Sequence, residues 1–435
     1  MKRFVLPALI FAYALAFRIH GIEDHFLLLG DQIRDWRIVS GGFTDLPLLG
    51  TPRHSGGFSH GPIFYWILWL SRQLIGPFTN QLPHAGGIGI AIFYSFSAAA
   101  LYRALLNRMS FAFSTTAILF IVSSPWEASF SGNAAWNPGV AVGFVNLSMA
   151  AALAAVEWKG RIVAIALGWL AFQAHVPAIF FFTGLLAGMI ALEFRQFGPG
   201  KSFSLFVRAA IVLLILQIPY LAAMHRGELL AGGPILDSLI RAIENPSSIH
   251  PTSAYRFIRR GAVLLLFENS EFVQRYTAFL VVPWILGILS LRPKGLWLFL
   301  AFLPVLGAIL GYSISQIEFD LYHLVTLMSS FVLLFVLGVQ SLARWTRLPL
   351  WIAFCYILVQ QPQRFAQAPT DRMDSYGSLI RGARKIVESG RKFSGVEFQE
   401  PGPDPLLVLE CLGKHATPGS PIALIDAKGN VEWRE

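Results

Sequence analysis

The chain has 435 residues, of which 55% are hydrophobic and only 14% are charged, and its formal net charge is +9. Soluble domains carry about 25% charged residues, so this composition excludes an ordinary water-soluble globular protein. The basic excess does not indicate nucleic-acid binding, because most Lys and Arg lie in short loops between apolar runs, as in proteins that cross a membrane many times.

The secondary structure within the membrane is predicted to be helical. Every backbone polar group must be paired inside hydrocarbon, which leaves helices or a closed barrel. The apolar runs are near the length of a spanning helix and do not alternate, so helices are favoured. The two cysteines, Cys355 and Cys411, form neither a disulfide framework nor a Cys-type metal site.

The first apolar run follows Lys2-Arg3 and could be a cleaved signal peptide or an uncleaved first helix. It continues to Arg18 and His20, and many further spans follow. We expect an uncleaved first helix.

The fold class predicted from the apolar runs is an all-α polytopic membrane protein with about eleven transmembrane helices. The expected spans are residues 4–20, 85–106, 111–126, 139–157, 161–177, 178–194, 204–223, 276–291, 295–312, 323–343 and 348–361.

The sidedness follows from the basic residues between these spans. With this set of spans, Lys2/Arg3, Arg103/Arg108, Lys159/Arg161, Arg195/Lys201, Arg292/Lys294 and Arg344/Arg347 all fall on one side. The positive-inside rule makes this side cytoplasmic. Residues 21–84, 127–138, 224–275, 313–322 and 362–435 are then outside.

Residues 63–75 are a short apolar and aromatic run that contains Arg72 and Gln73. If this run crossed the membrane, the span count would be twelve and the charge pattern of every later loop would reverse. We therefore predict a helix lying in the outer interface, where Trp and Tyr are favoured.

Residues 1–361 are predicted to form the transmembrane domain, and residues 362–435 a small soluble extracytoplasmic α/β domain. Within the latter, the apolar spacing predicts a helix over Ser375–Glu388. Leu406–Leu412 and Ile422–Ile425 are predicted to be strands.

The first outer loop holds the densest group of ionisable residues. On a helix, Asp31, Arg34 and Asp35 would share one face, whereas Gln32 would lie off it. A carboxylate there can accept a proton from an incoming hydroxyl, and a guanidinium can hold a phosphate. The alternative is a solvated, salt-bridged loop without chemistry.

Two further segments set this loop in context. The first segment lies later in the same loop and reads Ser59-His60-Gly61-Pro62-Ile63-Phe64-Tyr65-Trp66. The second lies at the outer start of a predicted helix and reads Ala135-Trp136-Asn137-Pro138. This order resembles the superfamily of polyprenyl-phosphate-dependent membrane glycosyltransferases, which includes the protein O-mannosyltransferases and the lipid A aminoarabinose transferases and has the GT-C fold. The resemblance covers most of residues 1–345.

The resemblance implies roles for individual residues. Asp31 matches the family's catalytic base, Gln32 the adjacent acid, and Arg34 the basic residue that meets the donor phosphate. His60 lies in the family's His/Lys-Pro segment, and Asn137 where a second acid is often found. Because Gln32 and Asn137 replace acids, a divalent metal is not supported, and no cofactor is assigned.

Further candidates for binding the donor phosphate or sugar lie at outer helix ends and in outer loops. They are Trp136, His175, Arg259, Arg260, Tyr322 and His323. Trp136 is a candidate platform for sugar stacking. Arg259 and Arg260 could hold the lipid phosphate or merely anchor anionic lipid headgroups.

The leading functional hypothesis is a glycosyltransferase, hexosyl or pentosyl, of the bacterial inner membrane with an outward-facing site. It would transfer a sugar from a polyprenyl-phosphate donor to a lipid, glycan or protein acceptor by an inverting, base-assisted displacement. No glycine-rich nucleotide-binding motif is present, which disfavours a nucleotide-sugar donor. A transporter or flippase is the alternative, although such proteins usually show internal repeats and charges near the midplane. A noncatalytic scaffold would leave the Asp31 group unexplained.

Overall fold

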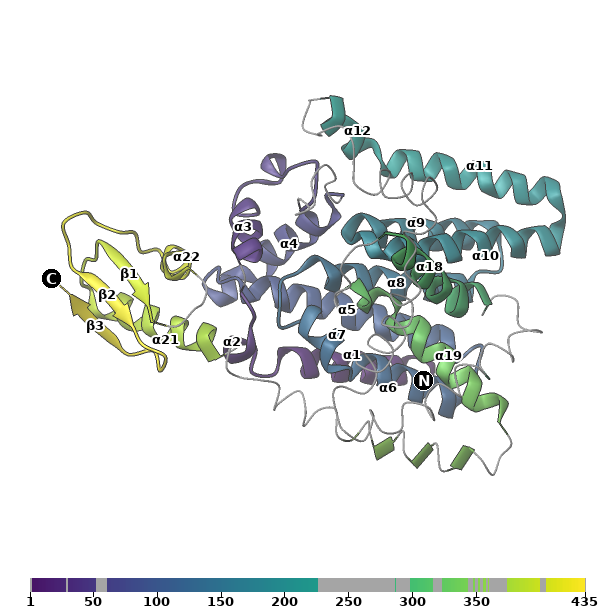
Figure 1. The fold of residues 1–435 in the computed structure, drawn as a ribbon, viewed down its shortest axis with the longest axis horizontal. Coiled ribbons are helices and arrows are strands. Elements are labelled where there is room, and N and C mark those ends of the chain that lie inside the picture. The colour runs from purple at the N-terminus through teal and green to yellow at the C-terminus, as the bar shows by residue number, and fades with distance from the viewer. Residues whose placement is uncertain are drawn as a thin grey trace.

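The protein is a bundle of helices with a small sheet-containing module at one end (Figure 1). The computed structural model describes residues 2–28, 30–51, 61–225, 298–315, 323–342, 374–399 and 404–434, with residue 286 and short stretches at 347–348, 351–352, 355–356 and 359.

Four of the described helices are long and apolar enough to cross a membrane. They are α5 (His84–Leu105), α8 (Asn137–Ala154), α10 (Ile179–Phe197) with its leading 3-10 turn η3 (Val176–Ala178), and α11 (Pro199–Leu216). Further apolar helices and turns complete the body: α1 (Lys2–Ile19), α6 (Phe111–Val122), α9 (Trp158–Ala174), α12 (Ile218–His225), η6 (Leu298–Phe302), α18 (Leu303–Ser315), η8 (Val325–Leu327) and α19 (Met328–Ser341). The chain is an integral membrane protein.

The predicted spans coincide with helices wherever the structure describes them, with shifted ends. The run expected to span 161–177 stops at Ala174, because a 3-10 turn with Pro177 follows and separates α9 from α10. The run expected over 111–126 stops at Val122, and a separate short helix, α7 (Pro125–Phe130), begins behind the cap residue Ser124. The span predicted at 276–291 and most of 348–361 lie outside the described residues.

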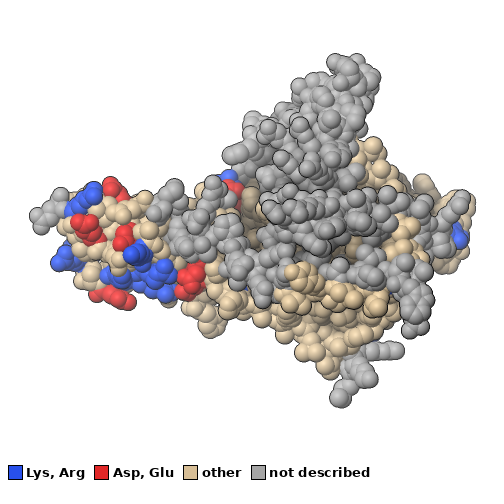
Figure 2. Space-filling view, turned by 60° about the horizontal axis from the view of Figure 1, so that its bottom comes forward, with Lys and Arg blue, Asp and Glu red and all other residues tan. Residues whose placement is uncertain are grey.

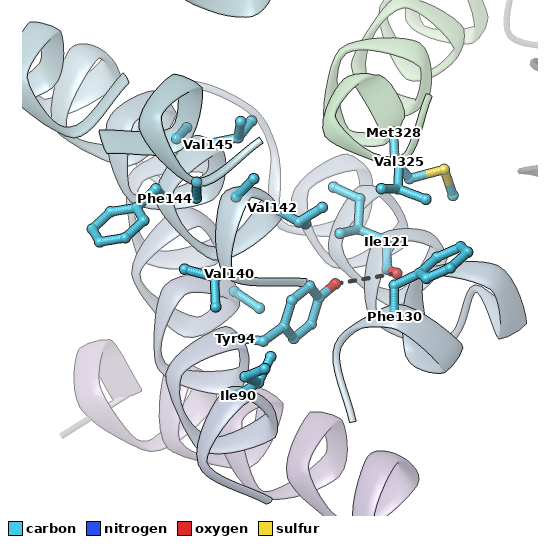
Figure 3. Close-up of a cluster of buried hydrophobic side chains, with 14 of the residues drawn as sticks. Ile90, Tyr94, Ile121, Phe130, Val140, Val142, Phe144, Val145, Val325 and Met328 are labelled. Atoms are coloured by element: carbon cyan, nitrogen blue, oxygen red, sulfur yellow. Dashed lines mark hydrogen bonds between the residues drawn. The ribbon is translucent and has the colours of Figure 1, made fainter. Parts of the chain in front are cut away.

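Helix α8 lies at the centre of the body, packed between α5 and α9, and it is the most buried of the four candidate spans. In lipid, helices associate through close packing more than through the hydrophobic effect, so small residues matter. Gly139 and Gly143 leave no room for a Cβ against the Phe130 carbonyl and the Phe93 ring. Figure 3 shows the core beside them, where the Tyr94 hydroxyl lies 3.4 Å from the Ile121 carbonyl oxygen.

The loop after the first span, which the sequence predicts to be outer, contains short helices. They are α2 (Ile22–His25), α3 (Gly30–Ile38), η1 (Phe43–Asp45), α4 (Ile63–Leu74) and η2 (Gly76–Thr79). With 12 residues, α4 is about 18 Å long, which is too short for a hydrocarbon core of about 30 Å. The helix expected there is confirmed, and its interfacial position stays a prediction.

The C-terminal module comprises residues 374–434. It contains α21 (Asp374–Ser389), β1 (Gly395–Phe398), α22 (Pro405–Cys411), β2 (Ile422–Ile425) and β3 (Val431–Arg434). The sheet has the order β1-β2-β3, with β1 parallel and β3 antiparallel to β2.

The helix expected over Ser375–Glu388 and the strand over Ile422–Ile425 are confirmed. The strand expected over Leu406–Leu412 is wrong, because these residues form α22. Asp404 caps that helix by accepting from the backbone N–H of Leu406, and Pro405 occupies its first turn.

Charge separates the module from the body. In Figure 2 the Lys, Arg, Asp and Glu side chains gather on the module, whereas the visible described surface of the body is almost free of them. In Figure 1 the module lies beside α2, and the turn between α10 and α11 lies at the opposite end of the molecule. The first loop and the C-terminal residues thus share one end, as the predicted sidedness requires.

Candidate active site

Helix α3 brings the polar residues of the first loop together. Asp31 lies in its first turn and Arg37 in its last, so both charges complement the helix dipole. The helical period places its polar side chains in two rows that differ in burial. Asp31 and Arg34 are half-buried, whereas Gln32 and Asp35 are buried, at 2% and 0% exposure.

Asp35 is the centre of the most connected group on this helix. Its Oδ1 accepts from Arg34 Nε at 2.9 Å and Nη2 at 2.7 Å, and from the Tyr65 hydroxyl on α4 at 2.9 Å. The Arg34 side chain is 40% exposed, whereas the Asp35 side chain that it pairs with is fully buried. We call Arg34, Asp35 and Tyr65 the Asp35 cluster.

Burial dominates the electrostatics of this cluster. It raises the pKa of Asp35 to about 6, against the opposing effects of Arg34 and the Tyr65 hydrogen bond. Burial, followed by the neighbouring Asp35 charge, also raises the pKa of Tyr65, so the phenol stays a hydrogen-bond donor at neutral pH. The arrangement fixes a guanidinium at the edge of the protein, which suits the binding of a phosphate.

The residues predicted to carry catalysis are therefore placed differently from one another. Asp31 is accessible, and its Oδ1 accepts the backbone N–H of Gln32 at 3.1 Å. The Gln32 side chain points into the protein, and its amide atoms have no hydrogen-bond partner among the described residues. The face expected to hold Asp31, Arg34 and Asp35 is thus split, because Asp35 belongs to the buried row with Gln32.

A second polar group lies where α8 begins and α9 ends. Asn137 Nδ2 donates to the Ala174 carbonyl at 2.9 Å and lies 3.4 Å from His175 Nδ1. The rings of His175 and His323 stack with centroids 6.1 Å apart. The half-buried Trp136 precedes this group, and the centre of its ring lies 5.5 Å from the centre of the Phe130 ring. The structure thus brings three of the predicted donor-binding residues together, namely Asn137, His175 and His323, and Trp136 directly precedes Asn137 in the chain.

Helix α4 links this second group to the Asp35 cluster. The Gly61 N–H, just before α4, donates to the Gln173 carbonyl at 2.8 Å, and a Cβ on Gly61 would collide with the Gln173 side chain. Tyr65, one turn further on, reaches Asp35. The other predicted residues, His60, Arg259, Arg260 and Tyr322, lie outside the described residues.

Sequence reasoning missed a buried charge cluster formed by Arg18, Tyr94, Glu127 and Ser131, which we call the Arg18 cluster. Arg18 Nε donates to Ser131 Oγ at 2.7 Å, and its guanidinium lies 3.6 Å from the centre of the Tyr94 ring. Tyr94 donates to Glu127 Oε2 at 2.6 Å. Ser124-Pro125-Trp126-Glu127, with its Ser and Glu at capping-box spacing, was the available signal for α7.

Within the described ranges, no three His, Cys, Asp or Glu side chains are grouped so as to hold a metal ion. The candidate site therefore consists of α3, the start of α4 and the junction of α8 with α9. What it offers chemically is an accessible carboxylate, a fixed guanidinium and a group of amide and imidazole donors.

Comparison with known proteins finds a similar fold among solved structures. No family model matches the sequence, and no curated protein matches it. Among solved structures, the crystal structure of ArnT from Cupriavidus metallidurans in the apo state is similar with a TM-score of 0.57 and 13% identity, covering 93% of this chain and 84% of that chain. ArnT bound to undecaprenyl phosphate gives a TM-score of 0.49, 12% identity and the same coverage.

ArnT is a lipid A aminoarabinose transferase with the GT-C fold. The family resemblance predicted from the sequence is therefore confirmed at the level of the fold. The similarity to ArnT in the apo state covers most of both chains, although few residues are identical.

Proposed function

We propose that this protein is a membrane glycosyltransferase that moves a sugar from a polyprenyl-phosphate donor to an acceptor outside the cytoplasmic membrane. The observation that carries the proposal is an Asp and an Arg one helical turn apart on the accessible side of α3, in the loop after the first span of an ArnT-like fold. The acceptor is a lipid, a glycan or a protein.

The proposed reaction is a single displacement. Asp31 takes the proton of the acceptor hydroxyl, and the acceptor oxygen attacks the anomeric carbon as the bond to the phosphate oxygen breaks. The polyprenyl phosphate leaves with the electron pair, and its charge is stabilised by Arg34, whose Nη1 is not used by Asp35. The anomeric centre is inverted.

The group at the α8–α9 junction has a complementary role in this proposal. Amide and imidazole groups such as Asn137 and His175 suit hydrogen bonding to sugar hydroxyls, and the half-buried Trp136 offers an aromatic face. Because this group and α3 both lie at helix ends, a donor whose lipid tail is in the membrane could there meet an acceptor that is in water.

The test uses the purified full-length protein in liposomes with a panel of synthetic polyprenyl-phosphate hexoses and pentoses. Wild type should release polyprenyl phosphate in the presence of an acceptor fraction, and mass spectrometry should find the added sugar on the acceptor. Asp31→Asn should lower the rate by about a hundredfold or more, as for loss of a general base.

A matched control is Asp45→Asn, which removes another, exposed acid of the same loop, whose hydrogen bonds among the described residues go to Gly42 and Thr44. It should transfer as wild type does. Full activity of Asp31→Asn would overturn the base assignment. Movement of the intact donor across the bilayer without sugar transfer would favour the flippase alternative.

A further inference from the structure

Helix α2, which follows the first span, and helix α3, which belongs to the candidate site, both contact the C-terminal module. Among the described elements, the main packing partner of α2 is α21 of the module, and that of α3 is the short helix α4. The position of α3 is therefore not set by the membrane-spanning helices alone.

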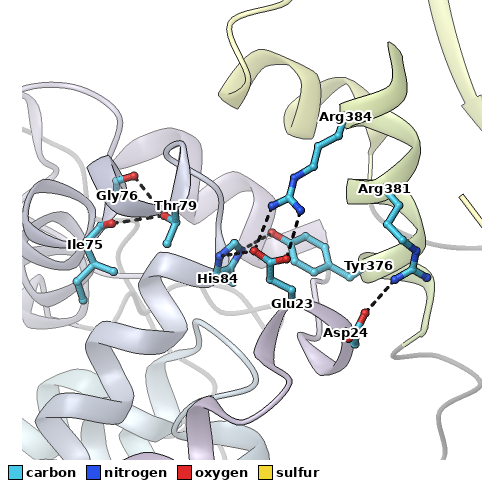
Figure 4. A network of polar contacts seen from close by, with 9 residues as sticks. All are labelled: Glu23, Asp24, Ile75, Gly76, Thr79, His84, Tyr376, Arg381 and Arg384. Carbon is cyan, nitrogen blue, oxygen red and sulfur yellow. Dashed lines mark hydrogen bonds and ion pairs between the residues drawn. The ribbon is translucent and has the colours of Figure 1, made fainter. Parts of the chain in front are cut away.

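The first attachment joins α21 to α2 by two ion pairs, shown in Figure 4. Arg381 Nη1 lies 2.9 Å from Asp24 Oδ1, and Arg384 Nη2 lies 3.2 Å from Glu23 Oε1. All four side chains are about half exposed, so each pair alone contributes little.

A buried aromatic centre lies beside these pairs. The Tyr376 hydroxyl of α21 lies 3.3 Å from Nδ1 of His84, at the start of α5, and its ring centre lies 5.1 Å from that of Phe26. Tyr376 and Phe26 are almost fully buried. Desolvated aromatic residues of this kind dominate the energetics of interfaces, with polar pairs around them.

Gly377 shows how closely the two helices approach. A Cβ at this position would lie 2.5 Å from Asp24 Oδ1 and 3.1 Å from Asp24 Cα. Glycine inside a helix is unfavourable relative to alanine. The close approach to α2 is thus the physical reason for glycine here.

The second attachment joins α22 to α3 itself. Arg37 Nη2 lies 3.1 Å from Asp404 Oδ2, and 3.6 Å from Glu410 Oε2. Asp404 is the residue that caps α22, so the cap and the contact with α3 form at the same place. The module therefore contacts the helices on both sides of the linker that precedes Asp31.

We propose that the C-terminal module is a clamp that sets the position of α3 for catalysis, with Tyr376, Gly377, Arg381, Arg384 and Arg37 as positioning residues. The inference rests on the proposed function only for its catalytic consequence. Misplacing a reacting group by about 1 Å can cost a hundredfold in rate, so a helix held by few contacts needs such a support.

The experiment compares Gly377→Ala and the double variant Arg381→Glu/Arg384→Glu with wild type in the full-length protein. The control Gly395→Ala adds the same methyl group within the module, where nothing lies within 4 Å. Hydrogen–deuterium exchange of residues 22–38 should accelerate about tenfold in the first two variants, and the transfer rate should fall by a similar factor. The control should match wild type in both measurements.

A charge swap tests whether the contact itself is responsible. Adding Glu23→Arg and Asp24→Arg to the double variant restores opposite charges across the interface, and both the slow exchange and the transfer rate should return. Unchanged exchange of residues 22–38 in Gly377→Ala and in the double variant would overturn the clamp, as would failure of the swap to restore it. If wild type transfers no sugar from any donor, the proposed function fails while the exchange result still decides the clamp.

Discussion

The Arg18 cluster and the Asp35 cluster are built from the same kinds of groups, namely an arginine, a carboxylate and a tyrosine, but they differ in reach. The Arg18 cluster draws on α1, α5 and α7 and is completely buried. The Asp35 cluster draws only on α3 and α4, and its arginine remains 40% exposed. The Arg18 cluster joins segments that are distant in the sequence, whereas the Asp35 cluster holds the Arg34 side chain at the protein surface.

The difference separates a structural role from a catalytic one. A charge sealed among helices cannot meet a substrate, and removing its partner leaves an uncompensated buried charge. A guanidinium anchored from behind and open in front loses little conformational freedom when a phosphate binds. We therefore propose a stabilising role for the Arg18 cluster and a substrate-binding role for the Asp35 cluster.

The largest effect is expected from Arg18→Met, because it strips Glu127 and Tyr94 of their cation. The free energy of unfolding should fall by about 3–5 kcal/mol, measured by denaturant titration in detergent. Arg103→Met, which removes a half-buried arginine whose Nη1 donates an exposed hydrogen bond to Asn107 Oδ1 at 2.9 Å, should change it by less than about 0.5 kcal/mol. Equal stability of the two variants would contradict the structural assignment.

The second prediction concerns pH. Since the pKa of Asp35 is about 6, lowering the pH from about 7 to 5 should protonate this carboxyl, weaken its hold on Arg34 and reduce kcat/KM about tenfold. The Asp35→Asn variant should lack this acid limb, and Asp45→Asn should keep it. A limb that persists in Asp35→Asn would assign it to another group.

The stability linked to Asp35 should change in the opposite direction. Its pKa in the folded state lies above the ordinary value of 3.8, so the folded protein binds this proton more tightly. This contribution to the free energy of unfolding is fully present below pH 3.8 and is lost as the pH rises through about 6. Acidification therefore lowers activity while this group's contribution to stability increases.

What the sequence could predict is what depends on local pattern. The apolar runs predicted the helices over the described residues, and the spacing of Asp31 and Arg34 predicted their shared, accessible row. The short apolar run at Leu406 was misassigned to a strand because length and period do not separate the two states over so few residues.

What it could not predict are contacts between distant segments. Arg18 was recognisable as the end of the first apolar run, but its partner Ser131 lies 113 residues away. Arg37 and Asp404 are separated by 367 residues. Local spacing cannot reveal such pairs, and for the same reason it placed Asp35 on one face with Asp31 and Arg34, although Asp35 is buried beside Tyr65 of α4.

The smallest effect is expected from Tyr65→Phe, which removes the 2.9 Å hydrogen bond to Asp35 Oδ1 and leaves both Arg34 contacts in place. That hydrogen bond favours the ionised carboxylate, so its loss should raise the pKa of Asp35 and move the acid limb of kcat/KM to higher pH. At pH 7 the rate should fall only about threefold. Tyr102→Phe, whose hydroxyl bonds Thr115 elsewhere in the body, should leave the limb unmoved. A limb that moved to lower pH would show that Tyr65 does not support the charge of Asp35, and the cluster would then hold Arg34 through the ion pair alone.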